Sequence, residues 1–166
     1  MKRFYFLFFV FLTMSVVAQQ RMNFLGQPLG CSLATFKQRM VAKGYKYKGE
    51  VETNIHYFDG VFGGEDVTVG AFVTPKSKIV YEIAVVYNNF LNSSKSDLDF
   101  KKELLINSFI KKYGYYTKEY SAYTEWQFDY GSIAIQVKYM SEHPIIIFYN
   151  DDIGNEKYKR ERELDY

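Results

Sequence analysis

The sequence of 166 residues is poor in cysteine and histidine. With Cys31 as its only cysteine the chain cannot form an internal disulfide, so its stability must come from packing. That thiol could pair between chains, although a small buried side chain at a helix start is the better interpretation. The only histidines are His56 and His143, and no group of His, Cys and Asp has the spacing of metal ligands. We therefore expect no metal and no cofactor.

Long apolar runs are confined to the start of the chain. Lys2 and Arg3 precede an apolar run that begins at Phe4 and gives way to small residues at Ala18. This order predicts a secretory signal peptide over residues 1–18, with cleavage after Ala18. The run is shorter than the roughly 20 residues that a membrane span needs, and no later run is long enough. We expect a secreted or periplasmic protein without a transmembrane segment after signal removal.

An excess of positive charge is missing as well. Residues 1–18 hold two of the 21 lysines and arginines and none of the 19 acids, so the rest of the chain carries 19 charges of each sign. A nucleic-acid-binding domain usually presents a basic surface. We therefore expect no nucleic-acid partner.

Catalytic motifs are not apparent. Acidic pairs occur at Glu65-Asp66, at Asp97 and Asp99, and at Asp151-Asp152. Two carboxylates that face each other can hydrolyse glycosides, but acids beside turns and helix starts more often bind backbone N–H groups. The sequence therefore indicates a protein that is not an enzyme. The alternative is a hydrolase of an envelope or glycan substrate that uses paired carboxylates.

What the sequence does have is aromatic side chains, 16 tyrosines and 15 phenylalanines, and regular apolar periodicity. Spacings of three and four predict helices, and alternation predicts half-buried strands. The expected helices are 32–43 and a second that starts at Ser96, where Asp99 approximates a capping box, and ends before Gly114. The expected strands are 54–62, 67–74, 79–87, 122–130, 132–140 and 144–149.

These elements predict an α+β domain made of two αβββ repeats. The helices should pack on one face of antiparallel sheet, in one continuous sheet or two. The domain should cover residues 19–166, with halves at about 19–90 and 96–150. The tail, 151–166, is rich in acids and bases at i,i+4 spacing, which favours a solvated, charged C-terminal helix.

Short motifs at both ends of this domain resemble a group of secreted proteins of gut bacteria. The motifs are the opening Phe24-Leu25-Gly26, the helix end Lys43-Gly44-Tyr45, and the ending Ile147-Phe148-Tyr149-Asn150. The doubled αβββ order resembles the tandem-repeat fold of β-lactamase inhibitor protein and its relatives. The resemblance implies that fold and no particular activity, because no binding motif of that family has a counterpart in this sequence.

Strand alternation indicates which face is free to bind. Val67 and Val69 belong to an apolar parity that should face the first helix, and Ile133 and Ile135 should face the second. The opposite parity should form an uncovered sheet face, and the alternative is a second buried layer or a sheet edge closed by the tail helix. We expect a non-enzymatic module that binds a protein or peptide through that face. The candidate binding residues are Phe72, Lys138, Gln136, His56, Phe58 and Gln127.

Overall fold

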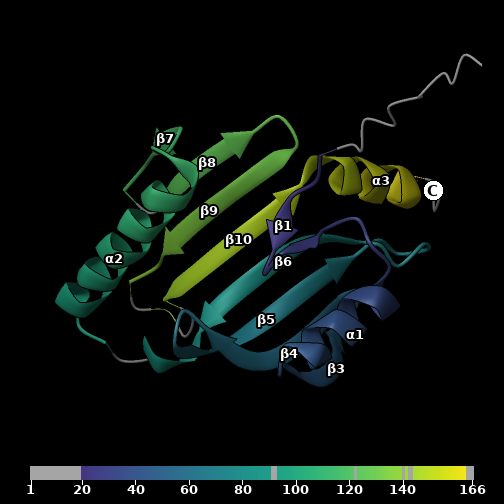
Figure 1. Ribbon diagram of the computed structural model, residues 1–166, viewed down its shortest axis with the longest axis horizontal. Coiled ribbons are helices and arrows are strands. Elements are labelled where there is room, and N and C mark those ends of the chain that lie inside the picture. The colour runs from purple at the N-terminus through teal and green to yellow at the C-terminus, as the bar shows by residue number, and fades with distance from the viewer. Residues whose placement is uncertain (1–19, 91–92, 122, 140, 142–143, 164–166) are drawn as a thin grey trace, which may run out of the picture.

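The computed structural model describes residues 20–90, 93–121, 123–139, 141 and 144–163. The predicted signal peptide, residues 1–18, and His143 lie outside these described residues. The fold is α+β, as the sequence predicts, with three helices, an eight-stranded antiparallel sheet and a two-stranded one (Figure 1).

The elements follow one another in two similar orders. A hairpin of β1 (Asn23–Phe24) and β2 (Gln27–Pro28) opens the chain. The first half continues with α1 (Leu33–Ala42), β3 (Lys46–Glu52), β4 (Ile55–Phe62), β5 (Glu65–Val73) and β6 (Val80–Tyr87). After a 3-10 turn, η1 (Asn88–Phe90), the second half has α2 (Lys95–Tyr113), β7 (Lys118–Glu119), β8 (Tyr123–Phe128), β9 (Gly131–Val137) and β10 (Ile145–Asp151). The last element of the described residues is α3 (Asp152–Glu163).

The strands of the two halves form one sheet. Its order is β3-β4-β5-β6-β10-β9-β8-β7, so the last strand of each half meets the other at the centre. There β10 pairs antiparallel with β6, with Ile147 opposite Val85. That the halves are repeats stays a prediction, although the order of elements on the two sides of the centre is the same.

Each half has one strand more than the sequence analysis expected. Those strands, β3 and β7, lie at the two edges of the sheet. Most residues of β3 are exposed, and both residues of β7 are. A strand that buries little surface does not require apolar side chains at every second residue. The sequences of β3 and β7 therefore lack the alternation by which the other strands were predicted.

Both large helices cover the same face of the sheet, with α1 over β3 and β4 and α2 over β8 and β9 (Figure 1). The register joins Val69, Val85, Ile147 and Ile135 in one row across four strands, and each of these side chains is fully buried. This row carries the apolar parity that the sequence predicted would face the helices. We call this side of the sheet the helix face.

The helix starts were predicted with unequal success. α1 begins as expected after Ser32, whose side chain accepts a hydrogen bond from the Thr35 N–H at 3.2 Å. The predicted start of the second helix at Ser96 was wrong, because Ser94 and Asp97 form the capping box. Both serines stand three residues before an aspartate, so the sequence pattern alone could not choose between them. Asp99 instead pairs with Lys95, one turn away, at 2.6 Å.

The space between α1 and α2 is filled by the first residues of the domain. Phe24 is fully buried, with its ring 5.8 Å from that of Phe62 and 5.2 Å from that of Tyr149. The loop after β2 joins the sheet, since the Gly30 N–H donates to the Val80 carbonyl at 2.7 Å. One core therefore runs under both helices.

The C-terminal helix α3 is docked more closely than the expectation of a solvated helix suggested. Its Glu161 is buried, and its carboxylate accepts hydrogen bonds from the backbone N–H groups of Lys76 at 2.8 Å and Ser77 at 3.1 Å. Gly154 lies against Tyr81, where an added Cβ would come within 2.5 Å of the tyrosine Cβ. Among the helices of the described residues, none is long and apolar enough to span a membrane.

Candidate functional site

The candidate site is the sheet face opposite α1 and α2, which we call the open face. Its residues alternate along the strands with the buried residues of the helix face and pair with one another across the sheet. Most of them keep partial access to solvent, unlike the core residues on the other side. Its central residues are Ile55, Tyr57, Gly70, Phe72, Glu82, Ala84, Val86, Ala134, Gln136, Ile146, Phe148 and Asn150.

An apolar ridge crosses the open face over β4 and β5. Gly70 has no side chain there, and the side chains of Tyr57, Ile55 and Phe72 lie 3.5, 3.6 and 3.7 Å from the position that a Cβ on Gly70 would take. The three side chains thus lean together over the glycine. Because each is half-buried, the ridge presents apolar surface to solvent without belonging to the core.

The apolar surface continues across the centre of the sheet. In one row Gly70, Ala84, Phe148 and Ala134 lie opposite one another on β5, β6, β10 and β9. Val86 and Ile146 pair in the next row. Small residues therefore alternate with larger ones in these rows.

Glu82 lies among these apolar groups. It is opposite Phe72 on β5 and Asn150 on β10, and it is half-buried. Burial raises the pKa of its carboxyl group above the ordinary value, because a low-dielectric surrounding disfavours the ionised form. None of the described residues pairs with it or forms a hydrogen bond to its side chain.

Other acids near the rim of the open face are neutralised. Asp59 pairs with Lys48 at 3.1 Å and accepts a hydrogen bond from the Thr68 hydroxyl at 3.1 Å. Glu125 lies 3.9 Å from Lys118. Glu82 is therefore a carboxylate of the open face that still lacks a cation among the described residues.

Aromatic rings extend the open face towards α3. The Phe72 ring lies 6.5 Å from that of Tyr81, and Tyr81 stacks on Tyr158 of α3 at 4.8 Å. Tyr81 takes this position at a bulge, since the register shifts between Phe72 and Val73. The bulge turns a residue of β6 outward to meet the helix.

Four of the six predicted binding residues lie on the open face. Phe72 and Gln136 are in its central rows and are half-buried. Gln127 pairs with Ser132 on the same face and is exposed. Lys138 comes directly after β9, two residues beyond Gln136, so it has the same parity as Gln136, and it is exposed.

The expected position of His56 and Phe58 was wrong, because both lie on the helix face. The register places His56 opposite Ala71 and Phe58 opposite Val69. Phe58 is fully buried and meets the Phe36 ring of α1 edge-on at 5.8 Å. Both parities of β4 contain aromatic residues, so the sequence could not show which parity belonged to the core.

His56 is buried in the core. Its Nδ1 lies 2.9 Å from the Tyr47 hydroxyl, while its buried Nε2 has no hydrogen-bond partner among the described residues. Burial lowers the pKa of the imidazole, and the nearby Glu50 opposes this shift. Cys31 is half-buried, and burial raises the pKa of its thiol, which disfavours the nucleophilic thiolate.

The sequence analysis missed Glu82, Phe148, Ile146 and Val86. A signal was present, since Glu82 is an acid within the otherwise apolar segment 79–87. In an antiparallel sheet with one covered face, such an acid marks the outward parity of a central strand. Ile146 lies between Ile145 and Ile147 in β10, so both parities of this strand carry isoleucine and the sequence does not show which parity faces the helices.

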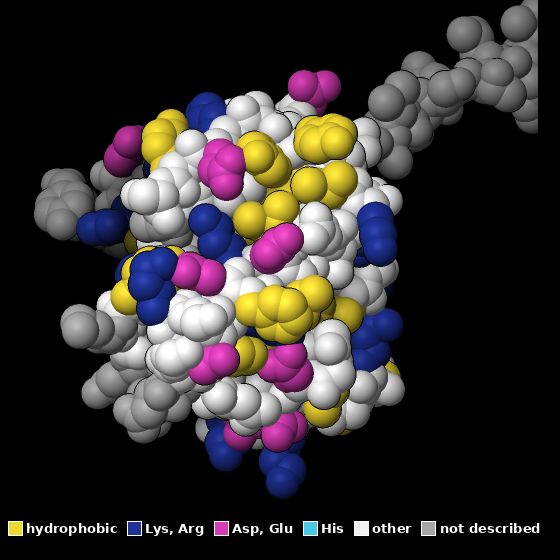
Figure 2. All heavy atoms as spheres, turned by 90° about the vertical axis from the view of Figure 1, so that its left-hand side faces the viewer, with side chains coloured by type: hydrophobic (Ala, Val, Ile, Leu, Met, Phe, Trp, Pro, Cys, Tyr) yellow, Lys and Arg dark blue, Asp and Glu magenta, His cyan; other side chains and the backbone are white. Residues whose placement is uncertain are grey.

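The side of the molecule that carries α2 is less suited to docking. Figure 2 looks onto this side and shows hydrophobic side chains in several patches separated by acidic and basic ones. Phe100, Leu104 and Tyr115 are the large hydrophobic residues exposed on or just after α2. Such separated residues are normal on a protein surface.

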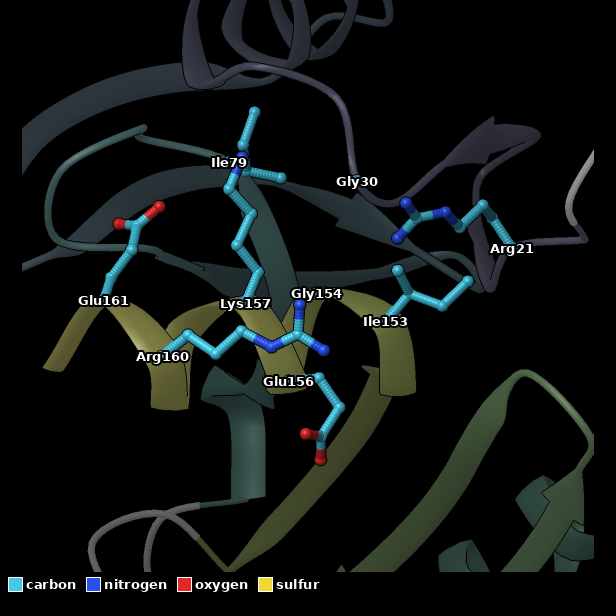
Figure 3. Close-up of a pocket in the computed structure, with 9 residues that line it drawn as sticks. All are labelled: Arg21, Gly30, Ile79, Ile153, Gly154, Glu156, Lys157, Arg160 and Glu161. Carbon is cyan, nitrogen blue, oxygen red and sulfur yellow. The ribbon is translucent and has the colours of Figure 1, made fainter. Parts of the chain in front are cut away.

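A cavity of about 680 Å³ lies between α3 and the loop after β2 (Figure 3). Its lining includes Glu156 and Glu161, whose side chains point away from each other in the figure. Glu156 pairs with Lys159 at 2.9 Å, and Glu161 holds the turn between β5 and β6. Both carboxylates are thus occupied by partners within the chain.

The same cavity is bordered by a partly buried ion pair. Arg21 pairs with Asp151, which is fully buried at the end of β10. Asp151 also accepts a hydrogen bond from the Gly154 N–H at 2.9 Å. Arg21 and Gly154 thus join residues near the first described ones to the start of α3. Because both contact the Asp151 carboxylate, no ligand is needed to explain its burial.

Within the described residues, no three His, Cys, Asp or Glu side chains gather in a way that could hold a metal ion. In comparisons with known proteins, no family model, no curated protein and no solved structure matched this chain. The functional conclusion therefore rests on the geometry of the open face.

Proposed function

We propose that this protein is a non-enzymatic binding module that holds a protein or peptide partner on the open face. The observation that carries the proposal is the uncovered apolar centre of an eight-stranded sheet, with Phe72, Phe148 and Ile146 half-buried. Apolar surface that stays partly in water is stabilised when a partner covers it. Aromatic residues are also enriched at protein interfaces.

The partner should bring a positive charge to Glu82. An ionised carboxylate in an apolar surrounding is disfavoured, and burial already raises the pKa of Glu82. A lysine or arginine of the partner would supply the missing counter-charge while its neighbours cover Phe72 and Phe148. We therefore propose a partner segment that combines apolar side chains with a basic one.

The site of action is part of the proposal. The signal peptide predicted over residues 1–18 supports a secreted or periplasmic location. The partner is then a protein or peptide of the cell envelope or of the extracellular space. The alternative function is a hydrolase. No observation within the described residues supports it, because the acids that line the cavity beside α3 have partners within the chain.

Affinity capture from an envelope extract tests the proposal. The wild type is compared with a variant whose open face is obstructed by a bulky side chain. Ala134 is half-buried beside Phe148, so Ala134→Arg would raise a bulky cation in the middle of the open face. The same substitution at the exposed Phe100 of α2, Phe100→Arg, is the matched control. Melting temperatures of both variants report whether the fold is retained.

We expect a partner that the wild type and Phe100→Arg enrich equally and that Ala134→Arg fails to enrich. Quantitative mass spectrometry of the captured proteins measures this difference. Capture of the same proteins by a folded Ala134→Arg would show that the open face is not the binding surface. Absence of any protein enriched over the Ala134→Arg background would also contradict the proposal.

A further inference from the structure

A second cavity, of about 520 Å³, lies on the helix face, away from the open face. One wall is α2, with Leu104, Leu105 and Phe109 among its lining residues. The opposite wall is the turn between β4 and β5, at Phe62 and Gly63. Its volume falls in the range of small-molecule sites, about 300–1,000 Å³.

Tyrosine hydroxyls without partners distinguish this cavity from a packing defect. Tyr87 and Tyr149 line it and are 1% and 3% exposed, yet neither hydroxyl forms a hydrogen bond with any described residue. A buried tyrosine hydroxyl usually has a partner, as Tyr45 has in the Val61 carbonyl at 2.7 Å. Neither hydroxyl is among the buried polar atoms of the described residues that lack a partner, so both are open to solvent at the cavity, where water or a ligand accepts their hydrogen bonds.

The polar groups of the cavity favour an acceptor with a negative charge. Burial is the main cause that raises the pKa of the Tyr149 hydroxyl, and the neighbouring Tyr113, Tyr87 and Tyr45 raise it further. The hydroxyl therefore stays protonated and can donate a hydrogen bond. Two lysines of α2 also line the cavity. Lys101 pairs with Glu65, whereas Lys112 has no acid partner among the described residues. The lining therefore carries one positive charge in excess.

We infer that this cavity binds a small organic carboxylate. Its apolar body would lie against Phe62, Leu104 and Phe109, and its oxygens would accept hydrogen bonds from the Tyr87 and Tyr149 hydroxyls. Lys112 adds the counter-charge. This site is independent of the proposed function, because none of its lining residues belongs to the open face.

The probe for this site is 4-phenylbutanoate, with 4-phenylbutan-1-ol and 4-phenylbutylamine as its neutral and cationic counterparts. Calorimetry gives the affinities, and amide shifts in NMR spectra locate the site at Gly63, Lys101 and Ser108. Fluorescence of the only tryptophan, Trp126, is a second readout, because its ring lies 5.4 Å from that of Phe109. We expect the carboxylate to bind more tightly than the alcohol and the amine.

The double variant Tyr87→Phe, Tyr149→Phe keeps both rings and removes both hydroxyls. We expect it to bind 4-phenylbutanoate about 10-fold more weakly or worse, and to lose less affinity for the alcohol, because a hydrogen bond to a charged acceptor is stronger than one to a neutral oxygen. Tyr57→Phe, on the open face, is the matched control and should bind the carboxylate normally, as should Ala134→Arg. Equal affinity of the double variant and the wild type, equal binding of acid and alcohol, shifts at other residues, or no binding at all would each overturn the inference.

Discussion

The two faces of the central sheet are built from the same strands and share their registers, yet they meet different surroundings. Phe58 on β4 faces α1 and is fully buried, whereas Phe72 on the adjacent β5 faces away from the helices and is half-buried. Residue type and secondary structure are the same in both cases. The difference teaches that the face on which a phenylalanine of this sheet lies decides whether it is fully buried or keeps part of its surface in water.

Acids on the two faces differ in the same way. Asp151, on the helix face, is fully buried and pairs with Arg21. Glu82, on the open face, is half-buried and has no cation among the described residues. Burial of a charge is tolerated when the fold itself supplies the counter-charge. For Glu82 the described residues supply none, and we propose that a partner does.

Truncation of one phenylalanine on each face sharpens this comparison most. We expect Phe58→Ala to lower the free energy of unfolding by about 3–5 kcal/mol, as truncations of fully buried aromatic residues do. Phe72→Ala should lower it by about 1–2 kcal/mol, because part of its surface remains in water after folding. Urea denaturation measures both values. Equal losses would mean that the open face is as well covered as the helix face.

Removal of single tyrosine hydroxyls tests the helix face for the proposed ligand. Tyr45→Phe deletes the hydrogen bond to the Val61 carbonyl and should cost about 0.5–1.5 kcal/mol. Tyr149→Phe deletes a hydroxyl that has no partner among the described residues, so the unliganded protein should be as stable as the wild type or more stable. Thermal unfolding of the two variants, side by side, is the measurement. A loss at Tyr149 as large as that at Tyr45 would indicate a partner within the chain.

The titration of Glu82 separates stability from binding on the open face. Folding raises the pKa of this carboxyl group above its ordinary 4.5, so its contribution to stability is present below that value and is lost as the pH rises through the folded pKa. Glu82→Gln should therefore melt at a higher temperature than the wild type at pH 7, and the difference should shrink towards pH 4.5. The same variant should bind the partner more weakly. A lower melting temperature at pH 7 would reveal a favourable interaction of the carboxylate within the fold.

Lys138 should show the smallest effect on stability. Its side chain is exposed at the end of the open face, so Lys138→Ala should change the free energy of unfolding by no more than about 0.5 kcal/mol. Partner binding should nevertheless weaken if the contact extends to this end of the face. Unchanged binding would confine the contact to the centre of the sheet, around Phe72 and Phe148.

Much of the architecture could be predicted because its signals are local. Ser32 caps α1 as expected, and the alternation around Val69 and Ile135 identified the buried parity of β5 and β9. Edge strand β3 was missed because a mostly exposed strand carries no apolar alternation. The start of α2 was placed two residues late because two serine–aspartate pairs offer the same cap.

The candidate site could be predicted only in part. Phe72 and Gln136 followed from the alternation of their own strands. His56 and Phe58 did not, because β4 has aromatic residues on both parities and its register against β5 depends on the turn at Gly63-Gly64. The cavity between α2 and the β4–β5 turn had no counterpart in the sequence analysis, since its residues come from five separate elements and the turn between two of them.

The sequence by itself determined the class of the fold, the positions of its main helices and strands, and the apolar parity of β5 and β9. These properties depend on neighbours within a few residues, where side-chain periodicity and capping act. Only the tertiary structure decided that β6 and β10 meet at the centre, that Glu82 lies among apolar side chains without a cation from the described residues, and that Tyr87 and Tyr149 line one cavity. Those contacts join residues far apart in the chain, and they exist only once pairing across strands and the packing of α2 bring them together.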